Sequence, residues 1–184
     1  MRETTKSLRG SLLVSSGGLF DPNFRHTVVL LGEHNEDGAF GVVLNRATDV
    51  AARDAVPDLA DLLPPGEPVF QGGPVQPEGV VLLADCQSEW IADIPVLGSI
   101  GFVIGEIAPE TRHAIVRARV FAGYSGWGPG QLETEMAQDS WIVSPAHPED
   151  LFTDNPDLLW SRVLQRLGPE YRNLSRMPFD PSMN

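Results

Sequence analysis

Two glycine-rich segments and one Asn-Arg pair hold the residues best suited to binding chemistry. The first segment, Arg119 to Glu133, reads R-V-F-A-G-Y-S-G-W-G-P-G-Q-L-E and sets two aromatic rings among four glycines ahead of a predicted helix. Glycines tolerate positive φ and close backbone approach, and a helix N-terminus can receive an anion. The candidate ligand or partner residues here are Tyr124, Trp127, Gly128 and Gln131. Alternatively, both rings fill the core at a strand-to-helix corner, and the glycines make room for them.

The second segment and the Asn-Arg pair both suggest anion recognition. Gln71-Gly72-Gly73-Pro74-Val75 can form a backbone nest for an anion, with Gly72 and Gly73 as its candidate residues, although a plain turn between strands needs no ligand. Asn45-Arg46 closes a predicted strand, and its guanidinium is a planar fork that suits a carboxylate or a phosphate. The alternative for Arg46 is an exposed pair with one of the chain's many acids.

The sequence contains no constellation typical of catalysis or metal binding. Its histidines, at positions 26, 34, 113 and 147, show no HxH or HExxH spacing, so we predict no metal site. Ser125 lacks the G-x-S-x-G spacing of a nucleophile elbow, and neither a GxGxxG nor a Walker A motif occurs. Cys86 has an acidic neighbour, which raises a thiol pKa and reduces reactivity. We predict no catalytic residue and no cofactor.

Composition and charge narrow the class of protein. The chain has 184 residues, with 13 basic and 25 acidic side chains and a formal net charge of -12, which disfavours direct nucleic-acid binding. Its longest apolar run, Val80 to Ala84, is far shorter than the roughly twenty residues of a membrane span. Met1 to Gly10 lacks the apolar stretch of a secretion signal, and a single cysteine suits a reducing compartment. We expect a cytoplasmic protein with no membrane contact.

Apolar patterning predicts a β-rich domain that positions these segments. The predicted strands cover residues 11–15, 27–31, 40–44, 69–71, 79–84, 99–104, 116–122 and 139–144. The continuous apolar run 27–31 is typical of a central strand, and Asp37-Gly38 favours a hairpin with the strand that follows. The predicted helical segments are short, at 58–63, 108–110 and 131–138.

The sequence pattern of an amphipathic helix is clearest near the C-terminus. Asn155 is its predicted N-cap and Gly168 its C-cap, and Trp160, Val163, Leu164 and Leu167 share one face. We therefore predict one α+β domain over residues 10–184, after a flexible N-terminus at 1–9. Its expected fold is a compact mixed, largely antiparallel β-sheet or partly closed barrel, with several short helices and this C-terminal amphipathic helix.

Charge is unevenly distributed near this helix. Residues 120–161 contain seven acids and neither lysine nor arginine, after which Arg162, Arg166, Arg172 and Arg176 follow with only Glu170 opposing them. The acidic stretch suits either a basic partner or, more simply, a solvated face.

Several motifs in one order resemble a known family. They are Gly10-x-Leu12-Leu13, Asp21-Pro22-Asn23-Phe24-x-x-Thr27-Val28-Val29-Leu30-Leu31, Gly38-Ala39-x-Gly41-Val42-Val43-Leu44-Asn45-Arg46, Gln71-Gly72-Gly73-Pro74-Val75, Gly123 to Glu133, and Pro181-Ser182-Met183-Asn184. Together they are similar to the bacterial AlgH/YqgE family of uncharacterised proteins, across roughly 10–184. Ala47 and Ser125 stand where the family commonly has proline and alanine.

The resemblance implies a compact α+β protein with a mixed sheet, and it brings no catalytic residues. Our first hypothesis is a cytoplasmic, non-catalytic regulatory or binding module that acts through an unknown protein or small-molecule partner. The second is an enzyme with a composite site at Tyr124 to Gln131 and Asn45-Arg46. The family's name comes from a proposed regulator of alginate synthesis, so the third is a transcriptional regulator that binds DNA, which the net charge of -12 disfavours.

Overall fold

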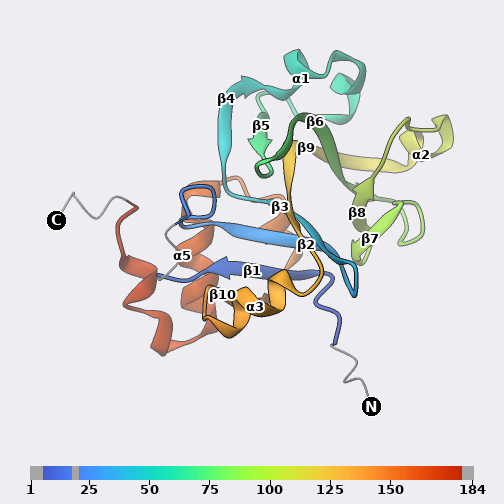
Figure 1. Ribbon diagram of the computed structural model, residues 1–184. Helices are drawn as coiled ribbons and strands as arrows, with labels where there is room; N and C mark the ends of the chain where they lie inside the picture. Colours follow the sequence, from blue (N-terminus) through green and yellow to red (C-terminus); the bar gives the residue numbers. More distant parts are fainter. Residues whose placement is uncertain (1–5, 18–20, 180–184) are drawn as a thin grey trace.

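An open ten-stranded sheet organises the computed structural model, which describes residues 6–17 and 21–179 (Figure 1). The strands are β1 (Ser11–Ser15), β2 (Val28–Asn35), β3 (Gly38–Val43), β4 (Ala47–Ala51), β5 (Pro68–Gln71), β6 (Val75–Cys86), β7 (Ile94–Leu97), β8 (Ile100–Val103), β9 (Ile115–Trp127) and β10 (Trp141–Pro145). The α-helices are α1 (Ala52–Ala55), α2 (Pro109–Ala114), α3 (Gln131–Ala137), α4 (Pro148–Leu151) and α5 (Pro156–Leu167). Three 3₁₀ turns are η1 (Pro57–Leu62), η2 (Pro169–Tyr171) and η3 (Leu174–Arg176).

The long strand β9 joins the two parts of the sheet. The strand order is β10-β1-β2-β3-β9-β6-β8-β7, and β5 adds to β9 with β4 beside it. The part of β9 from Ile115 to Tyr124 pairs with β6, whereas Ser125 to Trp127 pair with β3. Among the described strands, β5 and β9 form the one parallel pair, so the sheet is mixed but largely antiparallel. The described strands do not close into a barrel, and the predicted α+β fold with a mixed, largely antiparallel sheet is confirmed.

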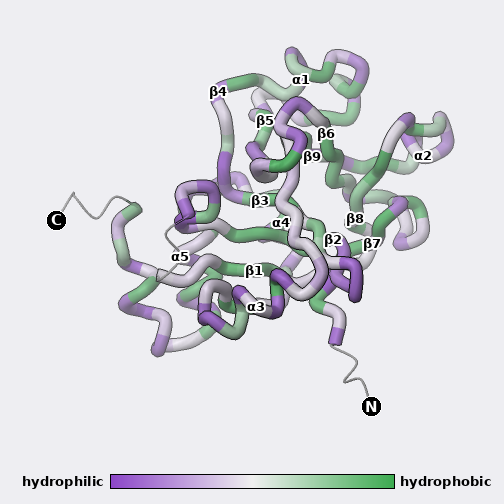
Figure 2. The backbone as a smooth tube through the Cα atoms, viewed as in Figure 1, coloured by the Kyte–Doolittle hydropathy of each residue, from purple (hydrophilic) through white to green (hydrophobic). Residues whose placement is uncertain are grey.

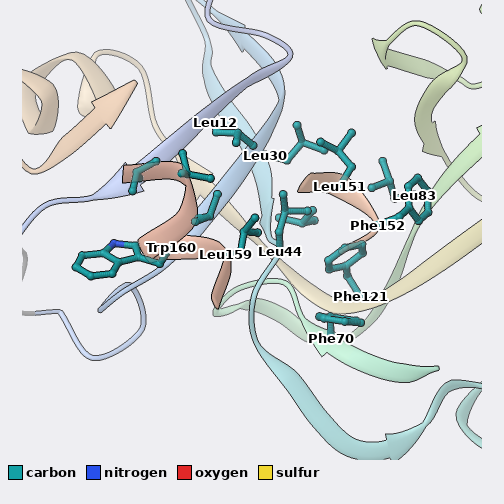
Figure 3. Packing of buried hydrophobic residues seen from close by; sticks show 14 of the residues in the cluster. Leu12, Leu30, Leu44, Phe70, Leu83, Phe121, Leu151, Phe152, Leu159 and Trp160 are labelled. Atoms are coloured by element: carbon teal, nitrogen blue, oxygen red, sulfur yellow. The ribbon is translucent and has the colours of Figure 1, made fainter. Parts of the chain in front are cut away.

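Both faces of the central strands are covered, as the apolar run 27–31 predicted. Leu12, Leu30 and Leu44 face α5, where Leu159 and Trp160 complete the core (Figure 3). On the opposite face, Leu13, Val29 and Leu31 pack with Trp127 and Trp141 beneath α3. Figure 2 shows hydrophobic residues concentrated in β1 to β3. Because successive side chains point to opposite faces of a strand, these strands contribute to two separate apolar layers.

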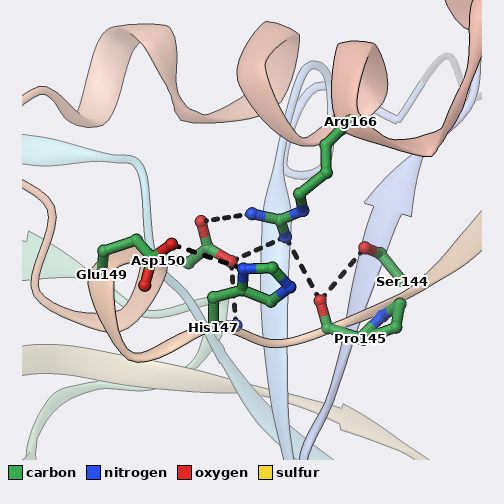
Figure 4. A network of polar contacts seen from close by, with 6 residues as sticks. All are labelled: Ser144, Pro145, His147, Glu149, Asp150 and Arg166. Atoms are coloured by element: carbon green, nitrogen blue, oxygen red, sulfur yellow. Dashed lines mark hydrogen bonds and ion pairs between the residues drawn. The ribbon is translucent and has the colours of Figure 1, made fainter.

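A buried ion pair fixes α5 against the end of β10 (Figure 4). Asp150 is fully buried, and its carboxylate accepts hydrogen bonds from Arg166 Nη1 at 3.1 Å and Nη2 at 2.8 Å. It also accepts the His147 amide at 3.0 Å, while Arg166 Nη2 reaches the Pro145 carbonyl at 3.2 Å. Burial makes this pairing necessary, because an unpaired charge inside the protein is costly.

The structure corrects several predicted elements. The segment Gly123 to Trp127 is the end of strand β9, and the turn comes only at 128–130. Strands β4 and β7 and helix α4 were not predicted, and β6 begins at Val75 instead of residue 79. Asn155 is the N-cap residue of α5, but its side chain makes no capping hydrogen bond, whereas Gly168 is the C-cap with φ 145° as predicted.

The predicted flexible N-terminus lies partly, and the last family motif wholly, outside the described residues. Residues 1–5, 18–20 and 180–184 are not described. In the described part, the Leu8 amide donates to His34 Nδ1 at 2.9 Å, and Arg9 Nε donates to the Pro95 carbonyl at 2.9 Å.

Candidate functional site

A polar cleft of about 650 Å³ lies where the β3–β4 link meets α5. Five segments far apart in the sequence supply its walls: the loop before β2, the link itself, the end of β5, the first turns of α5, and η3 with the chain that follows it. Its lining residues are Arg25, His26, Asn45, Arg46, Ala47, Gln71, Asp157, Trp160, Ser161, Ser175, Arg176, Met177 and Phe179. Of the predicted site residues, the cleft therefore contains Asn45 and Arg46.

Asn45 connects two segments of the backbone that line the cleft. Its Nδ2 donates to the His26 carbonyl at 2.8 Å, and its Oδ1 accepts the Val28 amide at 2.9 Å. Asn45 follows the buried Leu44, one residue beyond the end of β3, and its amide side chain bridges to the chain entering β2. Asn45 is therefore a positioning residue, because both ends of its amide are already satisfied by backbone.

Arg46 is held by the backbone of the loop before β2. Its Nη2 donates to the carbonyls of Pro22 at 2.9 Å and Arg25 at 3.2 Å, and its own carbonyl accepts the Gln71 amide at 2.8 Å. Burial lowers the pKa of Arg46, with Asp21 acting in the opposite direction, yet a guanidinium stays charged at neutral pH. A fixed, partly desolvated cation is thus built into the cleft.

His26 has a backbone conformation that is uncommon for histidine. Its φ is 50°, and its ring stacks on Trp160 with centroids 3.8 Å apart and planes at 11°. Trp160 is in turn anchored by its indole Nε1, which donates to the Ser15 carbonyl at 2.9 Å. Burial, and then the charge on Arg25, lowers the pKa of His26. Left-handed residues of this kind are concentrated at functional sites.

The cleft concentrates positive charge in an acidic chain. Arg25, Arg46 and Arg176 line it, and Asp157 is the acid among its lining residues. An apolar wall stands beside them: the Phe179 ring lies 5.6 Å from the Arg25 guanidinium carbon and packs edge-on to His26. This arrangement can attract an anion and desolvate part of it.

The predicted glycine segments meet each other, but they leave no space for a ligand. The Gly72 amide donates to the Ala122 carbonyl at 2.9 Å, and the Gly72 carbonyl accepts the Val43 amide at 2.8 Å and Ser125 Oγ at 3.1 Å. A Cβ on Gly72 would overlap the Gly123 carbonyl, and one on Gly73 would overlap the Tyr124 carbonyl. These glycines allow the backbone of β9 to lie close beside the chain that leaves β5.

The aromatic residues of the first segment are packed. Tyr124 lies against Phe40 with ring centroids 5.2 Å apart, and Trp127, only 6% exposed, packs edge-on against Trp141. Gln131 accepts the Gly128 amide at 3.1 Å, which braces the turn before α3. The residues lining the cleft include none of Tyr124 to Gln131, so the two halves of the composite site envisaged from the sequence do not share it.

Sequence reasoning missed Arg25, His26, Trp160 and Arg176 as site residues. The run of arginines from Arg162 onward was a usable signal for Arg176, whereas nothing local indicates the left-handed φ of His26 or its stacking on a distant tryptophan. Within 6–17 and 21–179, no group of three or more His, Cys, Asp or Glu side chains is placed to hold a metal. None of the helices in these ranges is long and apolar enough to span a membrane.

Comparisons with known proteins indicate one and the same family. A family model described as AlgH-like matches residues 12–172. A UPF0301 protein from Streptomyces coelicolor is 45% identical over 187 residues, which covers 97% of this chain and 96% of the relative. One from Mycobacteroides abscessus is 39% identical over 181 residues, with 95% and 87% covered.

Two solved structures share the fold. The crystal structure of a protein from Corynebacterium diphtheriae matches with a TM-score of 0.78 and 26% identity, covering 92% of each chain. The solution structure of the AlgH protein from Pseudomonas aeruginosa matches with a TM-score of 0.69 and 28% identity, covering 97% of this chain and 98% of that one.

Proposed function

The chain belongs to the AlgH-like family, and we propose that this member is a non-catalytic binding module that takes an anionic small molecule into the arginine-lined cleft. One observation carries the proposal: Arg25, Arg46 and Arg176 line one cleft in a chain whose net charge is -12. A volume of about 650 Å³ suits a small molecule, since ligand pockets commonly range from about 300 to 1,000 Å³.

The arrangement of the cleft favours binding over catalysis. Asn45 is occupied by backbone groups, and Arg46 is braced at Nη2 by two carbonyls. These contacts make a rigid, charged receptor, whose preorganisation lowers the entropic cost of binding. The enzyme hypothesis has less support, because its two halves do not line a common cleft. We place the module in the cytoplasm, as the single cysteine Cys86 suggests.

A phosphate titration followed by NMR tests the proposal. Adding inorganic phosphate at low salt should shift the amide signals of Arg25, Arg46 and Arg176, and it should raise the pKa of His26, because a nearby anion favours the imidazolium form. The exchange Arg176→Gln should weaken phosphate binding by about tenfold, the usual effect of one charge-assisted contact. Arg176 is exposed, and none of the described residues forms an ion pair with it, so the variant should fold.

Lys6→Gln is the charge-matched control. Lys6 is exposed and does not line the cleft, so its neutralisation should leave phosphate binding unchanged. The proposal is wrong if phosphate and phosphorylated sugars shift no amide around the cleft, or if both variants weaken binding equally. A substrate screen that finds turnover requiring cleft residues would favour the enzyme hypothesis instead.

A further inference from the structure

A second hollow adjoins the cleft through a shared arginine. It measures about 390 Å³ and is lined by Gln165, Gly168, Pro169, Arg172 and Arg176. Arg176 lines both spaces, whereas Arg172 lines only the second one. Arg176 therefore lies between the two spaces, with Arg46 among the residues that line the first and Arg172 among those that line the second.

The backbone that carries these two arginines is well fixed. The Arg172 amide donates to the Pro169 carbonyl at 3.1 Å, and the Arg176 amide donates to the Asn173 carbonyl at 3.2 Å. Ser175 is buried and donates through Oγ to the Arg172 carbonyl at 2.8 Å. Consecutive 3₁₀ turns thus hold both residues in place, and Glu170 is the one acid in residues 168–176.

Both guanidinium groups are free to receive a ligand. Among the described residues, neither Arg172 nor Arg176 makes a side-chain hydrogen bond or an ion pair, and both are exposed. By contrast, Arg166 on the same C-terminal segment is committed to Asp150. Within 6–17 and 21–179, the positive charge of the Arg172 and Arg176 side chains is therefore not paired with an acid and can act on a ligand.

We propose that the ligand of the cleft carries two anionic groups, as a bisphosphorylated small molecule does. One group lies in the cleft beside Arg25 and Arg46, the other lies over Arg172, and Arg176 serves both. This inference rests on the proposed function, since it assigns the chemistry of the ligand to the same site. Guanidinium groups bind phosphate oxygens through paired hydrogen bonds, and a phosphate group carries more negative charge at pH 7 than a carboxylate, which favours phosphate at a site with several arginines.

Matched sugar phosphates test the inference. Titration calorimetry with glucose 6-phosphate and glucose 1,6-bisphosphate compares one anionic group with two on the same ring. The bisphosphate should bind about tenfold more tightly, beyond the about twofold statistical gain of a second phosphate. Arg172→Gln should reduce bisphosphate affinity to the monophosphate level and leave the monophosphate unchanged. Arg176→Gln should weaken both, and Lys6→Gln should weaken neither.

The amide spectrum supplies a readout that does not depend on any variant. Signals from Gly168 and Arg172 should shift with the bisphosphate and stay still with the monophosphate. If both sugars bind equally, or Arg172→Gln lowers both affinities alike, the two-anion inference is wrong while the proposed function stands. If neither sugar nor inorganic phosphate binds, the proposed function fails and the inference fails with it.

Discussion

Glu135 shows how a single acidic residue organises the aromatic layer beneath α3. Its Oε2 accepts the indole Nε1 protons of Trp127 at 2.9 Å and Trp141 at 2.8 Å, and its Oε1 accepts Gln131 Nε2 at 3.0 Å. Both indole rings are nearly buried, at 6% and 5% exposure. The acidic stretch 120–161 is therefore more than a solvated face, since Glu133, Glu135 and Asp150 each have defined partners.

Removing this carboxylate should destabilise the fold. We expect Glu135→Ala to lower the free energy of unfolding by about 2 kcal/mol, because two buried indole donors lose their acceptor. Urea unfolding followed by tryptophan fluorescence measures the change. Glu149→Ala is the control, since Glu149 is exposed and its one described contact, with His147 at 3.3 Å, is at the surface. A loss within about 0.5 kcal/mol for Glu135→Ala would contradict the assignment.

Glu133 makes stability depend on pH. Hydrogen bonds from its own amide and from His34 lower the pKa of Glu133 from its ordinary value of 4.5. His34 Nδ1 accepts the Leu8 amide, so its Nε2 carries the proton that reaches Glu133 at 2.7 Å. A lowered folded-state pKa adds stability above the unfolded-state pKa, and this stability is lost as the pH falls through the folded-state value.

The exchange Glu133→Gln isolates this effect. Wild type should exceed the variant in unfolding free energy at pH 7, and the difference should shrink as the pH approaches 3. Chemical denaturation at several pH values measures both proteins in parallel. A difference that stays constant from pH 7 to pH 3 would mean that Glu133 acts only through shape or through its uncharged contacts.

At the scale of elements, the close approach between β9 and the chain that leaves β5 depends on Gly72. A Cβ at this position would overlap the Gly123 carbonyl, which is backbone and cannot swing aside. We expect Gly72→Ala to cost about 3 kcal/mol or to prevent folding, as overpacking of this severity does. Gly128→Ala is the matched control, because its Cβ would meet nothing nearer than Gln131 Oε1 at 3.9 Å. Thermal unfolding measures the stability of the two variants, and equal melting temperatures would show that the close approach at Gly72 does not limit stability.

The elements also show where sequence reasoning succeeds. Strands β1, β2 and β3 were predictable because each contains a short apolar run that is buried on both faces, and helix α5 because its apolar residues follow the helical period and face one core. Strand β4 was missed because its A-T-D-V-A sequence is mostly exposed, and β7 because Pro95 interrupts a short edge strand. Gly123 to Trp127 resembled a turn, yet pairing with Gly41 and its neighbours in β3 makes it a strand, since strand formation depends on tertiary context.

The candidate site was only partly predictable for the same reason. Asn45 and Arg46 were found because polar residues at the end of a buried strand are conspicuous. His26 and Trp160 lie 134 positions apart, and their stacking exists only once α5 has packed on the sheet. The glycines at 72 and 73 were predicted as candidate ligand residues, and in the structure they allow the backbone at Gly123 and Tyr124 to approach closely.

Across the whole molecule, positive and negative charges are unevenly distributed. Arginines line the cleft and the adjoining hollow beside α5, two of them half-buried (Arg25 and Arg46) and two exposed (Arg172 and Arg176), while the chain as a whole carries a net charge of -12. Such separation steers small anions toward one face and repels long polyanions from the remainder. Salt should therefore weaken ligand capture more strongly than it weakens the fold, because exposed charges are screened within about 8 Å at physiological ionic strength.

The pairing of β1 with β10 joins two strands that lie far apart in the sequence. Leu13 lies opposite Val143, so during synthesis β1 waits for β10 before its hydrogen bonds are complete. Until then, β2 is the one described strand that can pair with the apolar segment Leu12 to Val14. Such distant pairings slow folding and prolong the exposure of apolar strands, so refolding of this protein should be slow and prone to aggregation.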